Sequence, residues 1–281
     1  DADDLREAIL QWARGVDVKD SNGNGSTNDY RTQMGDPIHS QPIIVNYGTN
    51  DSAIFVATNQ GMLHSFDTAT GEENFAIMPK ELLQNLHHFY KDTPSLDHEY
   101  GLDGDMVLRT VEGKKYLYVG MRRGGRNYYV FDVTAKDSPK LKFQLTGGEG
   151  ALTKLGQTWS KPTITKVNMG GVVRNVMIVG GGYDEAQDAR LVRANDAVGN
   201  AIFMFDADTG GLLWSASNAD ASLNISSMNY SIPGRISVID RDNDGFADHM
   251  YAADTGGQLF RFDIYNGKSG NDFIKGARLA D

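Results

Sequence analysis

The stretch "IFVATNQGMLHSFDTATGEENF", residues 54–75, contains two apolar runs separated by a glycine turn, and the second run ends in Phe66-Asp67. Short β-branched and aromatic runs punctuated by Gly, Asn and Asp predict antiparallel strands. Three later segments repeat this order of strand, turn, strand and Phe-Asp pair, namely residues 116–137, 176–214 and 250–270. Their pairs are Phe131-Asp132, Phe205-Asp206 and Phe262-Asp263. The sequence therefore predicts a fold built from a repeated unit of strands.

Asp67 and Asp206 each begin the same pattern, Asp-x-x-Thr-Gly, and an aromatic residue follows it, Phe75 in one copy and Trp214 in the other. An Asp side chain caps a tight turn by accepting hydrogen bonds from nearby backbone N–H groups, and Gly adopts positive φ. We therefore expect a turn at both places, and we expect the aromatic side chain to pack onto the next sheet.

Successive Phe-Asp pairs are 57 to 74 residues apart. A minimal propeller blade has roughly 40 to 45 residues, so insertions must account for the excess. Such units cannot bury their apolar faces alone, and each must stack on its neighbours. The sequence predicts an all-β fold, a β-propeller of about four to five blades that forms an incomplete ring.

The start of the chain differs from the repeats. Leu5, Ile9 and Trp12 follow helical spacing, and a polar loop rich in Gly, Asn and Ser comes after them. A second helix is expected from Pro79 to Tyr90, since Pro suits the first turn. We divide the chain into a helical lead-in with a polar loop, residues 1–30, and propeller blades, residues 31–281.

Composition excludes several classes of function. The 281 residues carry a net charge of −10, with a pI of about 5.0, which argues against binding nucleic acid. There is no cysteine, so thiolate zinc sites and disulfide frameworks are excluded. The sequence has no run of 18 apolar residues, so it predicts no transmembrane helix. The chain starts with Asp1, and we expect it to be a piece of a longer protein whose targeting signal lies outside it.

A cluster of acids lies in the last repeat. Asp240, Asp242, Asp244 and Asp248 occupy positions 1, 3, 5 and 9 of a loop that has Gly245 at position 6. Carboxylate and carbonyl oxygens are the ligands that Ca²⁺ prefers, and the carbonyl of Phe246 at position 7 can add to them. Strands flank this loop and Tyr251 replaces the EF-hand Glu at position 12, so we predict a calcium loop between strands. The alternative is a solvated acidic turn without metal.

A weaker copy of this loop follows the first helix. Asp20, Asn22, Asn24 and Asn28 occupy positions 1, 3, 5 and 9, and Gly25 is at position 6. Amide oxygens are neutral, so a calcium site here would bind more weakly than the site formed by aspartates. A flexible polar loop without metal remains an equal alternative.

Four landmarks resemble the PilY-type family of type IV pilus biogenesis factors and tip adhesins. They are "RTQMGDPIHSQPIIV", "NQGMLHSFDTATGEENFAIMPKELLQNL", "VGGGYDEA…GNAIFMFDADTGGLLW" and "VIDRDNDGFADHMYAADTGGQLFRFD", and they occur in the order of the family from about Arg31 to Asp263. The Asp-x-x-Thr-Gly-x-x-x-Trp pattern also resembles a motif of quinoprotein propellers. The resemblance implies a quinoprotein-like propeller with modified blades.

The same resemblance implies a non-enzymatic protein that binds Ca²⁺ and supports pilus assembly, surface adhesion and twitching motility. The implied partners are pilins or minor pilins and a host-surface receptor, and the implied location is extracellular, at the pilus tip or outer membrane of a Gram-negative bacterium. One alternative is a pyrroloquinoline quinone dehydrogenase, a class that commonly uses a vicinal disulfide, for which this chain has no cysteine. Another alternative is a propeller scaffold for envelope assembly.

Overall fold

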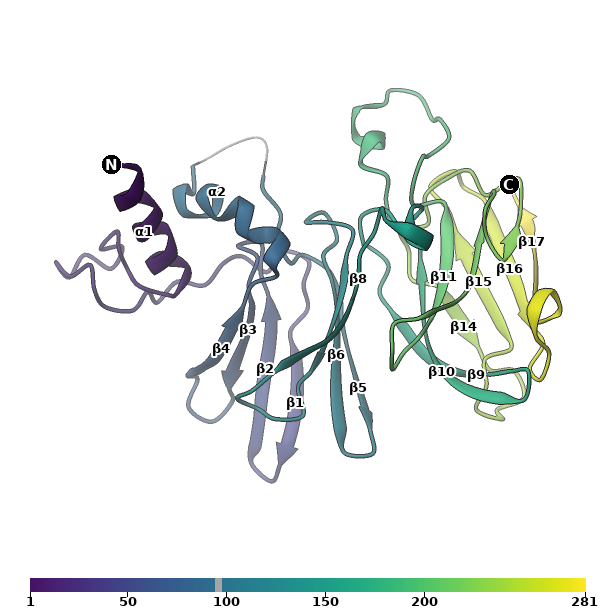
Figure 1. The fold of residues 1–281 in the computed structure, drawn as a ribbon, viewed down its shortest axis with the longest axis horizontal. Coiled ribbons are helices and arrows are strands. Elements are labelled where there is room, and N and C mark those ends of the chain that lie inside the picture. The colour runs from purple at the N-terminus through teal and green to yellow at the C-terminus, as the bar shows by residue number, and fades with distance from the viewer. Residues whose placement is uncertain (94–97) are drawn as a thin grey trace.

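The computed structural model describes residues 1–93 and 98–281 of the chain. Its strands form four sheets that stand side by side in chain order, with the N-terminal helix at one end of the row and the last sheet at the other (Figure 1). The predicted all-β architecture is therefore confirmed, with one sheet for each Phe-Asp repeat. No helix within the described ranges is long and apolar enough to cross a membrane.

The sheets are built from consecutive strands. The first two sheets contain β1 (Ile43–Gly48), β2 (Asp51–Ala57), β3 (Leu63–Asp67) and β4 (Glu73–Ile77), then β5 (Met106–Val111), β6 (Lys114–Gly120), β7 (Tyr128–Asp132) and β8 (Lys140–Leu145). The third contains β9 (Thr163–Met169), β10 (Val172–Gly180), β11 (Ala201–Asp206), β12 (Leu212–Ser217) and β13 (Leu223–Asn224). The fourth contains β14 (Ser237–Ile239), β15 (His249–Ala253), β16 (Leu259–Ile264) and β17 (Ile274–Ala280). Neighbouring strands pair antiparallel, except that β13 is parallel to β12.

The Asp-x-x-Thr-Gly turns form as predicted. The Asp67 carboxylate accepts hydrogen bonds from the backbone N–H groups of Ala69 and Thr70, at 2.7 and 3.0 Å. Asp206 makes the same two contacts one repeat later, with Asp208 and Thr209, both at 3.0 Å. Gly71 and Gly210 have φ of 76° and 78°, which L side chains rarely adopt.

Apolar side chains fill the spaces between adjacent sheets. Three buried clusters lie between the first and second, second and third, and third and fourth sheets. Trp214 of the third sheet meets Phe262 of the fourth edge to face, with ring centroids 5.9 Å apart, as the repeat pattern predicted. Each large apolar side chain buried here contributes about 1.5–3 kcal/mol, so sheet-on-sheet stacking is the main source of stability.

The helices lie at one end of the first sheet. In α1 (Ala2–Ala13), Asp1 caps the first turn by accepting hydrogen bonds from the N–H groups of Asp3 and Asp4. The helix expected from Pro79 to Tyr90 is two helices, a 3₁₀ helix (Lys80–Asn85) followed by α2 (Leu86–Lys91). Asp92 ends α2 with φ of 47°.

One buried carboxylate joins the loops of the first two sheets. The Asp103 side chain is fully buried. It lies 2.7 Å from Nδ1 of His39, accepts a hydrogen bond from Nδ2 of Asn59 at 3.2 Å, and pairs with Nη1 of Arg122 at 3.4 Å. Asn59 follows β2 and Arg122 follows β6, so Asp103 ties together this end of both sheets.

Candidate metal sites

The loop 240–248 connects β14 to β15, the first two strands of the fourth sheet. Its base is fixed by the strand register, in which Ile239 pairs with His249 and the Asp248 N–H donates to the Ile239 carbonyl at 2.8 Å. Ala247 is fully buried, and its N–H donates to the carbonyl of Lys166 in β9 at 2.9 Å. The loop is therefore bonded to the neighbouring sheet as well as to its own.

Hydrogen bonds inside the loop fix its curvature. Oδ2 of Asp240 accepts from the Gly245 N–H at 2.8 Å, across five residues. Asp242 accepts from the Asp244 N–H at 3.3 Å, and Asp244 accepts from the Phe246 N–H at 2.8 Å. Asn243 and Gly245, at positions 4 and 6, have φ of 62° and 91°. These two left-handed residues turn the backbone around the three aspartates.

The loop brings together three of the four predicted carboxylates. Oxygens of Asp240, Asp242 and Asp244 lie within 4.8 Å of one another, and all three residues are exposed. Asp248 has a different position, because its Oδ2 accepts from the Arg241 N–H at 2.8 Å and closes the mouth of the loop. Converging anionic oxygens of this kind suit a hard divalent cation such as Ca²⁺. The Phe246 carbonyl remains a predicted ligand.

The loop 20–28 shares several backbone features with the loop 240–248. Asp20 accepts from the Gly25 N–H at 3.1 Å, Asn22 accepts from the Asn24 N–H at 3.1 Å, and Asn24 accepts from the Ser26 N–H at 2.8 Å. Positions 4 and 6 are again left-handed, with φ of 70° at Gly23 and 83° at Gly25. The two loops therefore share three hydrogen bonds and two backbone turns at matching positions.

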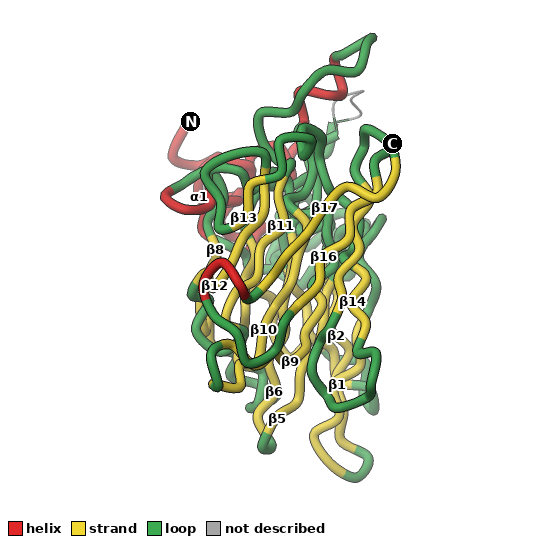
Figure 2. The backbone as a smooth tube through the Cα atoms, turned by 90° about the vertical axis from the view of Figure 1, so that its right-hand side faces the viewer, coloured by secondary structure: helices red, strands yellow, loops and turns green. Residues whose placement is uncertain are grey.

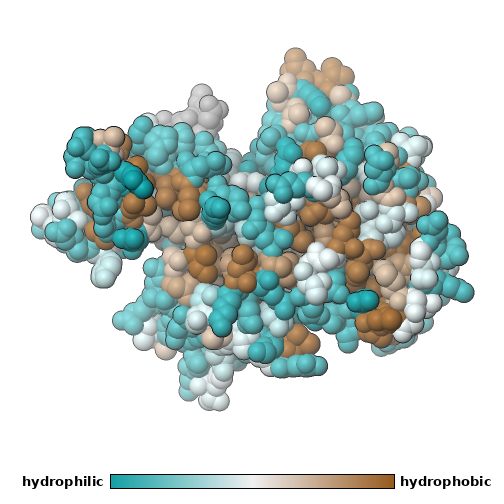
Figure 3. All heavy atoms as spheres, in the orientation of Figure 1, coloured by the Kyte–Doolittle hydropathy of each residue, from teal (hydrophilic) through white to brown (hydrophobic). Residues whose placement is uncertain are grey.

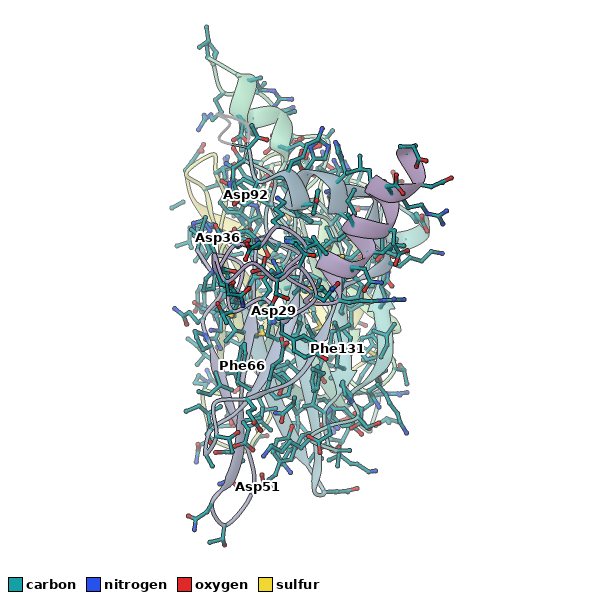
Figure 4. The ribbon with its side chains drawn as sticks, turned by 90° about the vertical axis from the view of Figure 1, so that its left-hand side faces the viewer. Asp29, Asp36, Asp51, Phe66, Asp92 and Phe131 are labelled. Carbon is teal, nitrogen blue, oxygen red and sulfur yellow. The ribbon has the colours of Figure 1, made fainter. Side chains whose placement is uncertain are left out.

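Asp29 directly follows the loop 20–28, and the sequence analysis did not predict it as part of this candidate site. Its Oδ2 accepts from the side-chain amides of Asn22 at 2.9 Å and Asn24 at 2.7 Å, while its buried Oδ1 has no hydrogen-bond partner among the described residues. These amide hydrogen bonds lower the pKa of Asp29, which keeps it ionised. Figure 4 places Asp29 between the helices and Phe66 of the first sheet. Its position 10 falls outside the alternating pattern, so spacing alone did not indicate it.

Asp17 supports the same loop from its other side. Asp17 is almost fully buried, and its carboxylate accepts hydrogen bonds from the N–H groups of Ser21 and Asn22, at 2.9 and 3.2 Å. The backbone hydrogen bond from Ser21 is the main cause that lowers the pKa of Asp17. The Asp17 N–H in turn donates to the Asp29 carbonyl at 2.8 Å. Asp17 and Asp29 thus make the loop more anionic than its three asparagines suggest.

Comparison with known proteins matches most of this chain to one family. The model of the PilY1 beta-propeller domain matches residues 22–278. The type IV pilus biogenesis factor PilY1 of Pseudomonas aeruginosa strain PAK is 26% identical, over 96% of this chain and 24% of that protein. A homolog of this factor from Xylella fastidiosa strain Temecula1 is 30% identical, over 80% of this chain and 15% of that protein.

Among solved structures, the crystal structure of the C-terminal domain of Pseudomonas aeruginosa PilY1 is similar to this chain. The two share 26% sequence identity with a TM-score of 0.54, over 76% of this chain and 39% of that one. The chain spans about a quarter or less of the length of the curated relatives named above.

Proposed function

Because the chain belongs to the PilY1 beta-propeller family, we propose that it is a calcium-binding propeller that acts in type IV pilus biogenesis. The family predicted from the four sequence landmarks is confirmed by the match over residues 22–278. The observation that carries the calcium part of the proposal is the convergence of Asp240, Asp242 and Asp244 within 4.8 Å.

The donor set of the loop 240–248 fits Ca²⁺ by its chemistry. Three exposed carboxylates at this separation repel one another, and a divalent cation removes the repulsion. Ca²⁺ accepts six to eight oxygen ligands in flexible geometry, so Asp248, the Phe246 carbonyl and water can complete the set. Since Ala247 is bonded to β9, an ion in this loop would also stiffen the contact between the third and fourth sheets.

We propose that the loop 20–28 is a second, weaker calcium site. Asp20 and the ionised Asp29 supply negative charge, and the side chains of Asn22, Asn24 and Asn28 supply amide oxygens. The Oδ1 atoms of Asn22 and Asn24 each accept one backbone hydrogen bond and keep a second lone pair that could face an ion. The matching backbone of the loop 240–248 supports this assignment.

Replacing two amides by carboxylates is expected to strengthen this second site. In an Asp244→Ala background, the pair Asn22→Asp and Asn24→Asp should tighten calcium binding about tenfold, because affinity rises with the number of charged ligands. Without calcium the same variant should melt at a lower temperature, since two new carboxylates face Asp29 in place of its two hydrogen-bond donors. Calorimetric titration and thermal melting measure both effects.

The matched control is Thr27→Asp, which adds a charge at position 8 of the same loop, outside the predicted ligand positions. It should leave calcium affinity within about twofold of the background protein. Equal affinity in the double variant and in this control would contradict a metal site in the loop 20–28.

We place the proposed activity outside the cell, at the pilus tip or outer membrane, with pilins or minor pilins and a host-surface receptor as partners. Extracellular calcium modules bind with dissociation constants of about 10⁻⁴ to 10⁻³ M, and the carboxylates of the loop 240–248 favour a tighter site that stays filled at about 1 mM calcium. Surface adhesion and twitching motility would then depend on whether the fourth sheet is held in place. The family membership and the loop geometry support this proposal.

The proposal predicts a pilus phenotype. Asp244→Ala in the full-length protein should reduce surface piliation and twitching, because it removes one of the three converging carboxylates without touching the core. The measurement is a count of surface pili by electron microscopy, together with the diameter of the twitching zone. Asp137→Ala, an exposed turn residue outside both loops, is the control. Piliation and twitching that stay equal in the two variants would contradict a calcium-dependent role.

We infer that the propeller is not an enzyme, because the sequence has no cysteine and no Ser/His/Asp arrangement whose order or spacing is better than chance. The purified chain should bind no pyrroloquinoline quinone and should reduce no dye in the presence of alcohols or sugars. Absorbance spectroscopy after reconstitution with the quinone measures this. Stoichiometric quinone binding would favour the dehydrogenase alternative, and normal piliation after deletion of the gene would favour an envelope scaffold.

A further inference from the structure

The connection between β16 and β17, residues 265–273, reaches from the fourth sheet to the third. It carries a short 3₁₀ helix, drawn in red beside the label β12 in Figure 2. The N–H of Gly267 donates to the Asn168 carbonyl at 2.7 Å, and the N–H of Gly170 donates to the Lys268 carbonyl at 2.8 Å. Asn168 lies near the end of β9 and Gly170 in the turn after it, so this connection holds the β9–β10 turn in place.

Asn266 joins the β9–β10 turn to the loop 240–248 through both ends of its side-chain amide. Its Oδ1 accepts from the Asn168 N–H at 2.8 Å, and its Nδ2 donates to the Ala247 carbonyl at 3.0 Å. Asn266 is half-buried. One side chain therefore bridges the C-terminal end of the loop and the end of β9.

The same contacts orient the peptide group that joins Phe246 to Ala247. Its N–H, which belongs to Ala247, donates to the Lys166 carbonyl of β9 at 2.9 Å. The C=O and N–H of a planar trans peptide point in opposite directions, so the Phe246 carbonyl points away from β9. That carbonyl is the predicted ligand at position 7 of the loop. Because Ala247 is bonded at its N–H to Lys166 and at its carbonyl to Asn266, the direction of this ligand is fixed from the third sheet.

Apolar side chains form most of the remaining contact between these two sheets. The buried cluster between them includes Trp214, Phe260 and Phe262. Apolar surface is also visible across the middle of the molecule (Figure 3). The hydrophobic effect is non-directional, so this cluster holds the sheets together without fixing the orientation of single peptide groups. Hydrogen bonds at the edge of the contact fix that orientation, and Asn266 makes two of them.

We propose that Asn266 is a positioning residue for the calcium site and couples this site to the third sheet. The inference rests on the proposed calcium site in the loop 240–248. With the Phe246 carbonyl fixed by ligation, the Ala247 carbonyl keeps its bond to Asn266, and Asn266 keeps its bond to Asn168. Coupling between two places is reciprocal, so a bridge that orders the β9–β10 turn when calcium binds also strengthens calcium binding by the same factor.

Hydrogen exchange of the chain, followed by mass spectrometry without calcium and at about 1 mM calcium, tests this coupling. In the unchanged chain, calcium should slow exchange about threefold or more in two places, the loop 240–248 and the peptide 166–172. Asn266→Ala should retain the slowing in the loop and lose it in the peptide 166–172. Calorimetric titration should also show calcium binding weakened about threefold to tenfold, the factor that one hydrogen bond typically contributes.

A second variant keeps half of the bridge. Asn266→Asp retains an acceptor for the Asn168 N–H and removes the donor to the Ala247 carbonyl. It should therefore also lose the calcium-dependent slowing in the peptide 166–172, although the bond to β9 can still form.

The matched control is Asn127→Ala in the second sheet. Asn127 also uses both ends of its amide, since it accepts from the Gly147 N–H at 3.2 Å and donates to the Tyr129 hydroxyl at 3.2 Å. Asn127→Ala should lower the melting temperature. It should leave the calcium affinity and the calcium-dependent slowing in the peptide 166–172 unchanged, because its contacts lie in another sheet.

The outcomes separate the bridge from the calcium site. If the slowing in the peptide 166–172 survives in both Asn266 variants, or if Asn266→Ala binds calcium as tightly as the unchanged chain, the bridge is overturned and the calcium site stands. Loss of the same slowing in Asn127→Ala would also overturn the bridge, in favour of general destabilisation. An unchanged chain that binds no calcium would overturn the site and the bridge together.

Discussion

Calcium at about 1 mM should raise the free energy of unfolding of this chain by roughly 2.7 kcal/mol, and Asp244→Ala should abolish most of this rise. The estimate follows from a dissociation constant of about 10 µM, at the weak end of sensor-type sites, and from binding to the folded state alone. The physical cause is the convergence of Asp240, Asp242 and Asp244 within 4.8 Å. Their mutual repulsion lowers the stability of the folded chain until a bound cation offsets it. Urea unfolding with and without calcium measures the change.

The controls separate a metal site from an acidic turn. Asp137→Ala removes a carboxylate of similar exposure outside the loop, and it should retain the full response to calcium. Magnesium should compete poorly, because it demands near-octahedral geometry and gives up its water reluctantly. If Asp244→Ala and Asp137→Ala respond alike in calorimetric titration, the aspartates of the loop 240–248 form an acidic turn only.

Removal of the buried Asp103 carboxylate should destabilise the chain by about 3 kcal/mol, irrespective of calcium. Breaking a buried ion pair costs about 3–5 kcal/mol, and the lower end applies here because Arg122 and His39 are 23% and 40% exposed. In Asp103→Ala, the buried amide of Asn59 and the guanidinium of Arg122 would each lose this acceptor. Urea unfolding followed by far-UV circular dichroism measures the loss.

Asp103→Asn tests whether charge or hydrogen bonding matters at this place. It preserves an acceptor for Asn59 but removes the charge that faces Arg122. We therefore expect Asp103→Asn to lower the free energy of unfolding by less than Asp103→Ala does. An unfolding midpoint for Asp103→Ala that equals that of Asp137→Ala would show that the network contributes nothing.

Most of the fold could be predicted from the sequence because its signals are local. The Asp-x-x-Thr-Gly pattern places Asp67 and Asp206 two residues before N–H groups that they cap. The turn therefore depends only on residues within the pattern. The segment from Pro79 to Tyr90 was less predictable. Its apolar spacing indicates a helix without distinguishing a 3₁₀ turn from an α turn, and packing at this end of the first sheet decides between them.

The candidate sites were predictable only where ligands alternate along the chain. Asp240, Asp242 and Asp244 converge through the backbone turns at Asn243 and Gly245, which the sequence also contains. Asp29 reaches its loop through a bridge between Val16 and Tyr30, a contact between segments that spacing along the chain does not reveal. Similarly, nothing in the stretch 181–200 indicated that the buried carboxylates of Asp184 and Asp196 would accept hydrogen bonds from the N–H groups of Ala197 and Ser231.

The arrangement of the sheets in a row has a mechanical consequence. α1 lies at one end of the row and β17 at the other, so tension applied between them passes through the three apolar clusters one after another (Figure 1). In such a series every cluster carries the whole load, and the weakest sets the force at which the row separates. The bond from Ala247 to Lys166 bridges the last of the three junctions, beside the loop 240–248. An ion bound in that loop would reinforce one link of the series, and it would raise the rupture force only if that link is the weakest.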